Sequence, residues 1–289
     1  MGKSFNTIEV MPLSPTLGAE VSGVDIAAGI DQEQFAELRQ AYIDYGVIFL
    51  REQHITPDQH LEFARRWGDI NVNRFFQAVA THPSIAEVRK EADQIANIGS
   101  SWHTDHSYDQ VPAMGSILYA REVPSVGGDT LFASMYAAYD ALSDGLKAML
   151  STMSALHSSR HAFGDGAYLD TDMEDLGGRL GNTEAATQDA IHPVIIRHPL
   201  SGRLALYVNG DFTVRFEGWS EQESKPLLDY LYAHASRNEF TCRFHWRQGS
   251  MAIWDNRATH HCALNDYHGQ RRLMHRVTID GVVLEAAAA

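Results

Sequence analysis

The sequence has only two cysteines among its 289 residues, Cys242 and Cys262. Two thiols cannot build the disulfide framework of many small secreted domains, so we expect a reducing compartment, the cytoplasm. Basic residues are also scarce, with 23 Lys and Arg against 37 Asp and Glu and a formal charge of −14. This charge argues against nucleic acid or an anionic membrane as a partner, but it allows a small anion in a local basic pocket.

Long apolar runs are missing as well. No run approaches the roughly 18 residues of a membrane span, and the first ten residues, MGKSFNTIEV, lack the apolar core of a signal peptide. Hydrophobic residues make up 44% and charged residues 21%, a balance typical of globular proteins. Because no repeat or linker divides the chain, we expect a single domain over residues 1–289, with no membrane partner.

The first third of the chain carries helix signals. Asp31 followed by Gln34 predicts a capping box at the start of a helix with an apolar stripe. The run VIFL at residues 47–50 predicts a buried strand after that helix. Thr56-Pro57 predicts the N-cap and first residue of a second helix, which we expect to close at Gly68.

Short β-type runs between turn signals dominate from Gly115 onward. They are GSILYA, DTLFA, PVIIRH, RLALYV, FTCRFHW, SMAIW and RLMHRVTI. Helices are predicted at about residues 134–151 and 220–235, and Pro226 predicts that the second of these begins late or kinks. The pattern indicates a mostly β protein with flanking helices (α+β), built on an antiparallel sandwich or barrel.

Two stretches lack periodicity. Residues 71–101 are irregular and run directly into the sequence WHTDH. Residues 165–189 are acidic and contain several glycines, so we expect a long surface excursion that is either a lid or a mobile segment.

The sequence WHTDH at residues 102–106 concentrates metal-ligand side chains. If this segment is extended, His103 and Asp105 project to one face and can hold one ion. With 15 histidines in the chain, one His-x-Asp is expected by chance, so the motif is weak alone. Residues 253–279, with four histidines and four arginines, are the strongest source of a third ligand. There His260 and His261 are adjacent and would point to opposite faces of a strand.

Three motifs in this order carry a resemblance to a known family. His103-x-Asp105, GGDTLFAS and WDNRATHHCALNDYHGQRRLMHR resemble the taurine dioxygenase family of Fe(II)/2-oxoglutarate-dependent dioxygenases, which includes alkylsulfatases and aryloxyalkanoate dioxygenases. The resemblance extends from LGAEVSGVDI near the start to HRVTI near the end. It implies a double-stranded β-helix (jelly-roll) core, the cofactors Fe(II), 2-oxoglutarate and O2, and a homodimer or homotetramer.

The resemblance also implies roles for individual residues. His103, Asp105 and His261 match the metal ligands, and His260 falls at a variable position of the pattern. Two histidines and one carboxylate leave three metal positions open, of which 2-oxoglutarate takes two and dioxygen the third. Arg272 matches the arginine for the far carboxylate of 2-oxoglutarate, a contact suited to a guanidinium. Thr130 matches the hydroxyl that assists it.

The substrate positions match the family only in part. Arg276 corresponds to the arginine that holds the sulfonate of taurine, and Phe163 and Phe212 match aromatic pocket positions. Asn73 and Phe76 replace a His and a Tyr that hold taurine in the family. The resemblance therefore implies oxidation of a small organic acid other than taurine, such as a sulfonate, a sulfate ester or an aryloxyalkanoate.

Three alternatives remain from the residues alone. The same oxygenase chemistry can act on a neutral metabolite, with Arg276 serving only structure. A His2Asp zinc site can activate water for hydrolysis, but it leaves Thr130 and Arg272 without a role. A non-catalytic β-sandwich that senses an acid or a metal also explains part of the ligand set.

Overall fold

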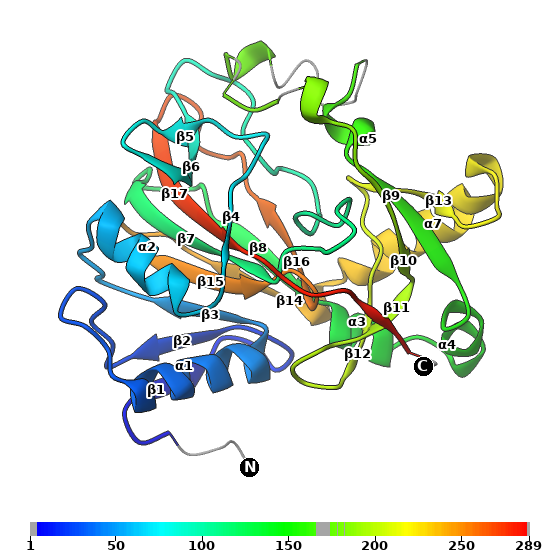
Figure 1. The fold of residues 1–289 in the computed structure, drawn as a ribbon, viewed down its shortest axis with the longest axis horizontal. Coiled ribbons are helices and arrows are strands. Elements are labelled where there is room, and N and C mark those ends of the chain that lie inside the picture. Colours follow the sequence, from blue (N-terminus) through cyan, green and yellow to red (C-terminus); the bar gives the residue numbers. More distant parts are fainter. Residues whose placement is uncertain (1–4, 166–173, 178, 182, 288–289) are drawn as a thin grey trace.

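The computed structural model describes residues 5–165, 174–177, 179–181 and 183–287 (Figure 1). The helices are α1 (Gln32–Tyr45), α2 (Pro57–Arg65), α3 (Met135–Asp140), α4 (Asp144–Leu150), α5 (Arg160–Phe163) and α7 (Glu221–Ala235), with 3-10 turns η1 (Thr183–Ala185) and η2 (Asn238–Phe240). Strands outnumber helices, as the sequence predicts.

Two sheets form the core. The major sheet has nine strands, in the order β1 (Glu9–Pro12), β2 (Ala19–Ser22), β3 (Val47–Leu50), β15 (Met251–Asp255), β7 (Gly115–Glu122), β17 (Arg272–Ile279), β6 (His82–Lys90) and β5 (Ala78–Val79), with β4 (Ile70–Asn71) also pairing with β17. The minor sheet has the order β14 (Thr241–Phe244), β8 (Thr130–Ser134) and β16 (Thr259–Ala263). Pairing is antiparallel except between β2 and β3.

Two smaller sheets complete the described topology. They are β10 (Asp189–Pro193), β9 (Ser154–Ser158) and β13 (Thr213–Phe216), and β12 (Leu204–Leu206), β11 (Ile195–Arg197) and β18 (Glu285–Ala286). In Figure 1 these strands lie with α3, α4 and α7 at the side of the molecule away from α1 and α2.

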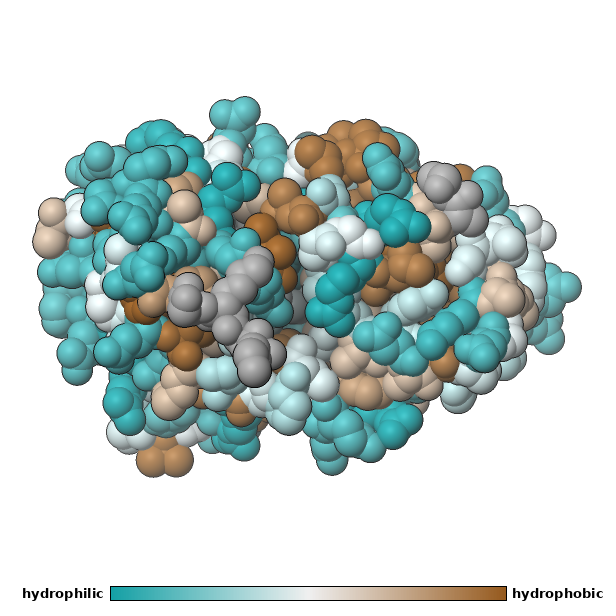
Figure 2. Space-filling model, turned by 90° about the horizontal axis from the view of Figure 1, so that it is seen from below, coloured by the Kyte–Doolittle hydropathy of each residue, from teal (hydrophilic) through white to brown (hydrophobic). Residues whose placement is uncertain are grey.

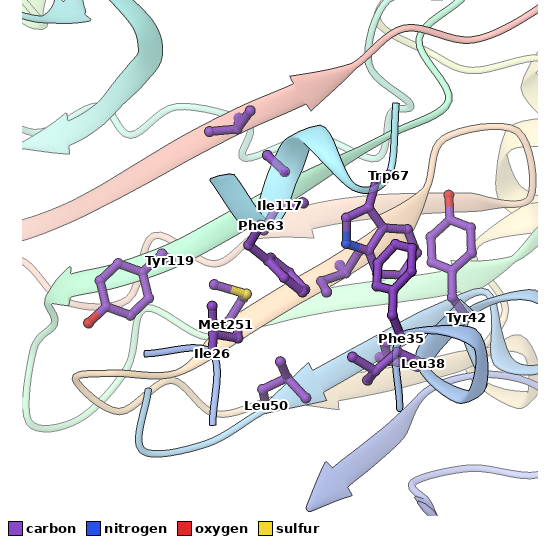
Figure 3. Close-up of a cluster of buried hydrophobic side chains, with 14 of the residues drawn as sticks. Ile26, Phe35, Leu38, Tyr42, Leu50, Phe63, Trp67, Ile117, Tyr119 and Met251 are labelled. Carbon is purple, nitrogen blue, oxygen red and sulfur yellow. The ribbon is translucent and has the colours of Figure 1, made fainter. Parts of the chain in front are cut away.

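The major sheet is buried on both faces, and successive side chains of each strand point alternately to its outer and its inner face. On the outer face, Ile117, Tyr119 and Met251 pack against side chains of α1 and α2, including Phe35 and Phe63 (Figure 3). This cluster explains the apolar stripe of the first helix.

On the inner face of the major sheet, alternate residues meet the minor sheet. Phe49 of β3 stacks on Phe244 of β14 with ring centroids 3.9 Å apart, and Trp254 of β15 lies 5.8 Å from Phe132 of β8. Two facing antiparallel sheets of this kind form the jelly-roll architecture, so the predicted fold class is confirmed.

The predicted elements hold with local corrections. Each of the seven β-type runs contains a strand, but residues 134–151 form two helices, α3 and α4. The carboxylate of Asp31 caps α1 by accepting from the amide of Gln34, whereas the Gln34 side chain donates to the Gly23 carbonyl, so the reciprocal half of the box is absent. The second helix ends at Arg65, three residues before Gly68.

The helix α7 and the irregular stretches also differ from expectation. Ser220 and Glu223 form a complete capping box, and α7 starts at Glu221 with Pro226 inside it, so a late start is wrong. Residues 71–101 contain the nine-residue strand β6. The predicted lid or mobile segment at 165–189 lies partly outside the described residues, which include η1 and a bridge between Leu180 and Phe76.

One face of the surface shows where polar side chains lie. The face in Figure 2 is mostly hydrophilic, with hydrophobic side chains in separate small patches. Among the helices that the structure describes, none has the length and apolar character needed to cross a membrane.

One buried histidine predicts how folding stability depends on pH. His60 of α2 is 1% exposed, and in the described part of the chain neither ring nitrogen has a hydrogen-bond partner. Burial, aided by the nearby His275, lowers the pKa of His60 from 6.5 to about 3. The unfolded chain therefore takes up this proton at a higher pH than the folded chain. The stabilisation is complete above pH 6.5 and is lost as the pH falls towards 3.

We expect His60→Phe to flatten the acid side of the stability curve. Each pH unit between the two pKa values is worth about 1.4 kcal/mol, so the wild type should lose roughly 2 kcal/mol more than the variant between pH 6.5 and 5. Phenylalanine suits the site because the imidazole packs edge-on against Tyr119, with centroids 6.0 Å apart. Urea unfolding at both pH values measures the difference, and parallel curves for the two proteins would contradict it.

Candidate active site

Two distant segments bring three ligand-type side chains together. His103 and Asp105 lie between β6 and β7, and His261 lies on β16. The His103 and His261 backbones pair directly, with N···O distances of 3.1 and 2.8 Å. The Asp105 carboxylate oxygens lie 3.8 Å from His103 Nε2 and 3.7 Å from His261 Nε2. All three side chains are buried, with their ligand atoms within 4.8 Å of one another.

A buried polar network positions both segments. The Asp255 carboxylate, at the end of β15, accepts from Arg257 Nε and NH2 at 2.9 and 2.7 Å and pairs with His198 Nε2 at 2.9 Å. Burial opposes ionisation of Asp255, but Arg257 and His198 hold its pKa below the usual range. Thr104 donates to the Asn256 carbonyl at 2.5 Å. The turn before β16 is thereby tied to the segment that holds His103 and Asp105.

Strand alternation separates the adjacent histidines of β16. His261 faces the interior between the two sheets, where it pairs in register with Phe132 and lines the cavity. His260 is also buried, but it is not part of the three-residue cluster. Burial, with a smaller effect of His103, lowers the pKa of His260 to about 3, so this ring is neutral.

The protonation states of the cluster suit a divalent metal ion. Arg276 NH1 lies 3.1 and 3.3 Å from the two Asp105 oxygens. Burial raises the pKa of Asp105, but the charge of Arg276 outweighs it and holds the pKa below the usual range. Burial and the neighbouring His103 lower the pKa of His261 well below its usual value. A carboxylate and a neutral imidazole are the forms that bind a metal, so these residues fit one.

The cluster opens into a cavity of roughly 800 Å³, a volume that includes space open to solvent. The structure brings all of the sequence-predicted site residues to its wall: His103, Asp105, His261, Thr130, Arg272, Arg276, Asn73, Phe76, Phe163 and Phe212. β17 supplies Arg272 and Arg276 from the inner face of the major sheet, because residues 272, 274 and 276 alternate to one side. The minor sheet faces them with Thr130 and His261.

Arg272 is a buried cation with free donors. It is 5% exposed, and its Nε and NH2 have no hydrogen-bond partner among the described residues. Burial lowers the pKa of Arg272. Trp246 Nε1 donates to Thr130 Oγ1 at 2.9 Å, which leaves the Thr130 hydroxyl hydrogen for another acceptor. A carboxylate would satisfy these donors, so the site fits one end of a dicarboxylate.

Arg276 contacts one acidic and one aromatic side chain, Asp105 and Phe76. NH1 pairs with Asp105, while Nε and NH2 are buried without a partner in the described part of the chain. The guanidinium carbon lies 4.3 Å from the ring centroid of Phe76, a cation–π contact. Asn73 is held at the cavity wall by the Phe75 amide, which donates to its Oδ1 at 2.8 Å, and by His106 Nε2, 3.1 Å from its Nδ2.

The cavity also contains residues that sequence reasoning missed. Tyr108 and Asp211 are polar wall residues, and Trp254 and Leu118 are apolar ones. Tyr108 belongs to the same segment as His103, so its position in the chain is a signal. Asp211 precedes the predicted Phe212, but only the folded chain brings it near His103.

A jelly-roll with two histidines and one carboxylate at a buried cavity defines the class of non-haem iron enzymes with a 2-His-1-carboxylate site. The chain belongs to the family described as "Taurine catabolism dioxygenase TauD, TfdA family", whose model matches residues 9–278. The resemblance inferred from the sequence motifs is thus confirmed.

Individual relatives agree with the family. An alkylsulfatase from Acinetobacter baylyi is 32% identical over 97% of this chain and 87% of the relative. An alpha-ketoglutarate-dependent sulfate ester dioxygenase from Pseudomonas putida is 33% identical over 96% of this chain and 90% of the relative. A crystal structure titled as a putative alpha-ketoglutarate-dependent taurine dioxygenase from Burkholderia xenovorans matches with a TM-score of 0.82 and 34% identity, over 98% and 96% of the two chains. The protein is a dioxygenase that depends on Fe(II), 2-oxoglutarate and O2.

Proposed function

We propose that this dioxygenase oxidises a C–H bond of a small organic acid, and that residues 1–289 act as one catalytic domain. In this proposal the metal ligands are His103, Asp105 and His261, and Thr130 and Arg272 bind 2-oxoglutarate. The substrate contacts are Arg276, Asn73, Phe76, Phe163 and Phe212.

One observation carries the proposal. Two buried guanidiniums, Arg272 and Arg276, reach the cavity from one face of β17, and each has nitrogens without a hydrogen-bond partner among the described residues. Leaving such donors unpaired is costly unless a ligand satisfies them. Arg272 lies over the Trp246 ring, whose Nε1 donates to Thr130, and it suits the far carboxylate of 2-oxoglutarate. Arg276 lies beside Asp105 and suits a second anion next to the metal ligands.

The side chains of the cavity prepare the reaction. Fe(II), 2-oxoglutarate and O2 together supply an oxidation that hydroxylates a substrate C–H bond while 2-oxoglutarate becomes succinate and CO2. The ring of His261 remains neutral and Asp105 remains ionised, so both can bind the metal together with His103. Arg276 orients the anionic end of the substrate, and the Phe76, Phe163 and Phe212 rings restrict water around it.

The substrate class follows from the chemistry of the wall. Asn73 and Phe76 stand where the family has a His and a Tyr that hold taurine, so the site does not suit taurine. The aromatic rings suit a substrate whose remaining part is hydrophobic or aromatic. We therefore favour a sulfonate, a sulfate ester or an aryloxyalkanoate, and the names of the two relatives above support the sulfate ester. Hydroxylation beside oxygen or sulfur gives an unstable product. It breaks down to sulfate, sulfite or a phenol and to an aldehyde or keto acid.

We expect succinate formation to respond strongly to long-chain alkyl sulfates, alkylsulfonates or aryloxyalkanoates and weakly to taurine. Arg276→Gln should lower kcat/KM for the favoured acid by about 30-fold or more, since truncating one side of a buried charged pair costs about 2–5 kcal/mol. The loss should be smaller for a neutral analogue of similar shape, because only the contact between Arg276 and Asp105 is then lost. Full activity of Arg276→Gln, or a preference for neutral analogues, would instead favour oxidation of a neutral metabolite.

The alternatives from the sequence have less support. A zinc hydrolase and a non-catalytic sensor give Thr130 and Arg272 no role, and the family is one of dioxygenases. We also propose a cytoplasmic location, consistent with two free cysteines, and a homodimer or homotetramer. Sedimentation at several concentrations tests the oligomeric state.

A further inference from the structure

The ring nitrogen of His103 that points away from the other ligands has a defined partner. His103 Nδ1 lies 2.8 Å from the Ser101 carbonyl oxygen. A carbonyl only accepts, so Nδ1 carries a proton, and in the neutral ring the free lone pair is then on Nε2. Nε2 is the atom that lies near the Asp105 carboxylate. The tautomer of His103 is thus set for metal binding by Ser101.

A second carboxylate stands behind this contact. Asp211 Oδ2 lies 3.5 Å from His103 Nδ1 and accepts from the Ser101 hydroxyl at 2.7 Å. Its side chain is only 11% exposed. In the part of the chain that the structure describes, no lysine or arginine pairs with it. Its carboxylate is therefore directed at His103 and Ser101, and burial and its charge together raise the pKa of the Cys262 thiol.

The loop that presents Asp211 is fixed by its own hydrogen bonds. The Asn209 side chain accepts from the Phe212 amide at 3.0 Å and donates to Ser107 Oγ at 3.0 Å. The Phe212 carbonyl accepts from the Ser158 amide at 2.8 Å. Because Ser107 belongs to the segment that follows His103 and Asp105, the loop and the metal-binding segment are held in one arrangement.

The second histidine of the cluster lacks such support. His261 Nδ1 is buried, with no hydrogen-bond partner among the described residues. The two imidazoles therefore differ, because only His103 has a carboxylate and a carbonyl at its remote nitrogen. Partners of this kind fix the orientation of a ligating histidine and raise its basicity.

We propose that Asp211 is a positioning residue for the metal ligand His103. Its negative charge stabilises the Nδ1–H tautomer and strengthens Nε2 as a donor, and its bond to the Ser101 hydroxyl holds the carbonyl in place. This inference rests on the proposed ligand set of His103, Asp105 and His261.

Metal affinity of the apoprotein tests the role of Asp211 without turnover. Anaerobic titration with Fe(II), and with Co(II) followed by its visible absorption bands, gives Kd for wild type, Asp211→Asn and Ser101→Ala. Asp211→Asn keeps the shape and an acceptor for Ser101 but removes the charge. Glu37→Gln is the matched control, because the carboxylate of Glu37 in α1 accepts from the Thr7 hydroxyl at 2.7 Å, away from the cluster. Circular dichroism reports folding, and Asp211→Ser replaces Asp211→Asn if the latter does not fold.

We expect Asp211→Asn to raise Kd for both metals about 10- to 100-fold and to shift the Co(II) bands, as is usual when the partner of a ligating histidine is lost. Ser101→Ala should raise Kd less, because the charge remains, and Glu37→Gln should leave Kd unchanged. A Kd for folded Asp211→Asn within twofold of wild type would overturn the inference, as would an equal loss in Glu37→Gln. If the wild type binds neither metal, the proposed ligand set fails, and the role of Asp211 fails with it.

Discussion

His261→Ala should abolish turnover and remove tight metal binding, whereas His260→Ala should largely spare both. The two side chains are adjacent on β16 and both are buried, but only His261 belongs to the three-residue cluster. Without His261 only His103 and Asp105 remain to hold the metal ion, so binding becomes weak. His103→Ala and Asp105→Ala should have the same effect as His261→Ala.

Anaerobic addition of Fe(II) and 2-oxoglutarate measures metal binding in each variant, because the complex of both with the protein gives a weak metal-to-ligand charge-transfer band in the visible. The band should appear in wild type and in His260→Ala and be lost in the three ligand variants. His260→Ala serves as the matched control for loss of a buried imidazole. Loss of the band in His260→Ala with its retention in His261→Ala would reverse the ligand assignment.

Arg272→Ala should raise KM for 2-oxoglutarate by a factor of about 30 or more, since losing one partner of a buried charged pair costs about 2–5 kcal/mol. The Nε and NH2 donors of Arg272 are buried and unpaired in the described part of the chain, so a bound carboxylate would be their main partner. KM for the organic acid should change much less, because Arg276 is intact.

Arg271→Ala is the control for Arg272. Arg271 is adjacent in sequence, but it is only half-buried and pairs with Glu91 and Glu122 outside the cavity. Initial rates at varied 2-oxoglutarate and saturating acid separate the two variants. If Arg272→Ala keeps the wild-type KM for 2-oxoglutarate, the far carboxylate binds elsewhere.

Periodicity and turn signals predicted much of the fold because the major sheet is regular and buried on both faces. They missed β6, whose sequence HPSIAEVRK mixes charged and apolar residues. This segment is a strand because it pairs with β17, and strand formation depends on such neighbours more than on local propensity. The start of α7 was also misjudged, since the capping box at Ser220 outweighs Pro226.

The site was predictable where its residues lie in short motifs, as in His103-x-Asp105. The motifs also placed Arg272 and Arg276, since strand alternation is readable from spacing. Asp211 was not predictable, because no motif links it to His103 and only the loop fixed by Asn209 brings them together. The unequal support of the two histidines likewise depends on contacts between distant segments.

The backbone pairing of His103 with His261 has a consequence for how tightly the fold is held. The proposed ligand set exists only when these two distant segments meet, so we expect a metal ion to bind the native chain and to find no comparable site on the unfolded one. Free metal at 100 times its Kd would then add about 2.7 kcal/mol to the free energy of unfolding. We therefore expect the melting temperature to rise with the free metal concentration and to fall when a chelator removes the metal, although the hydrogen bonds of the sheets stay the same.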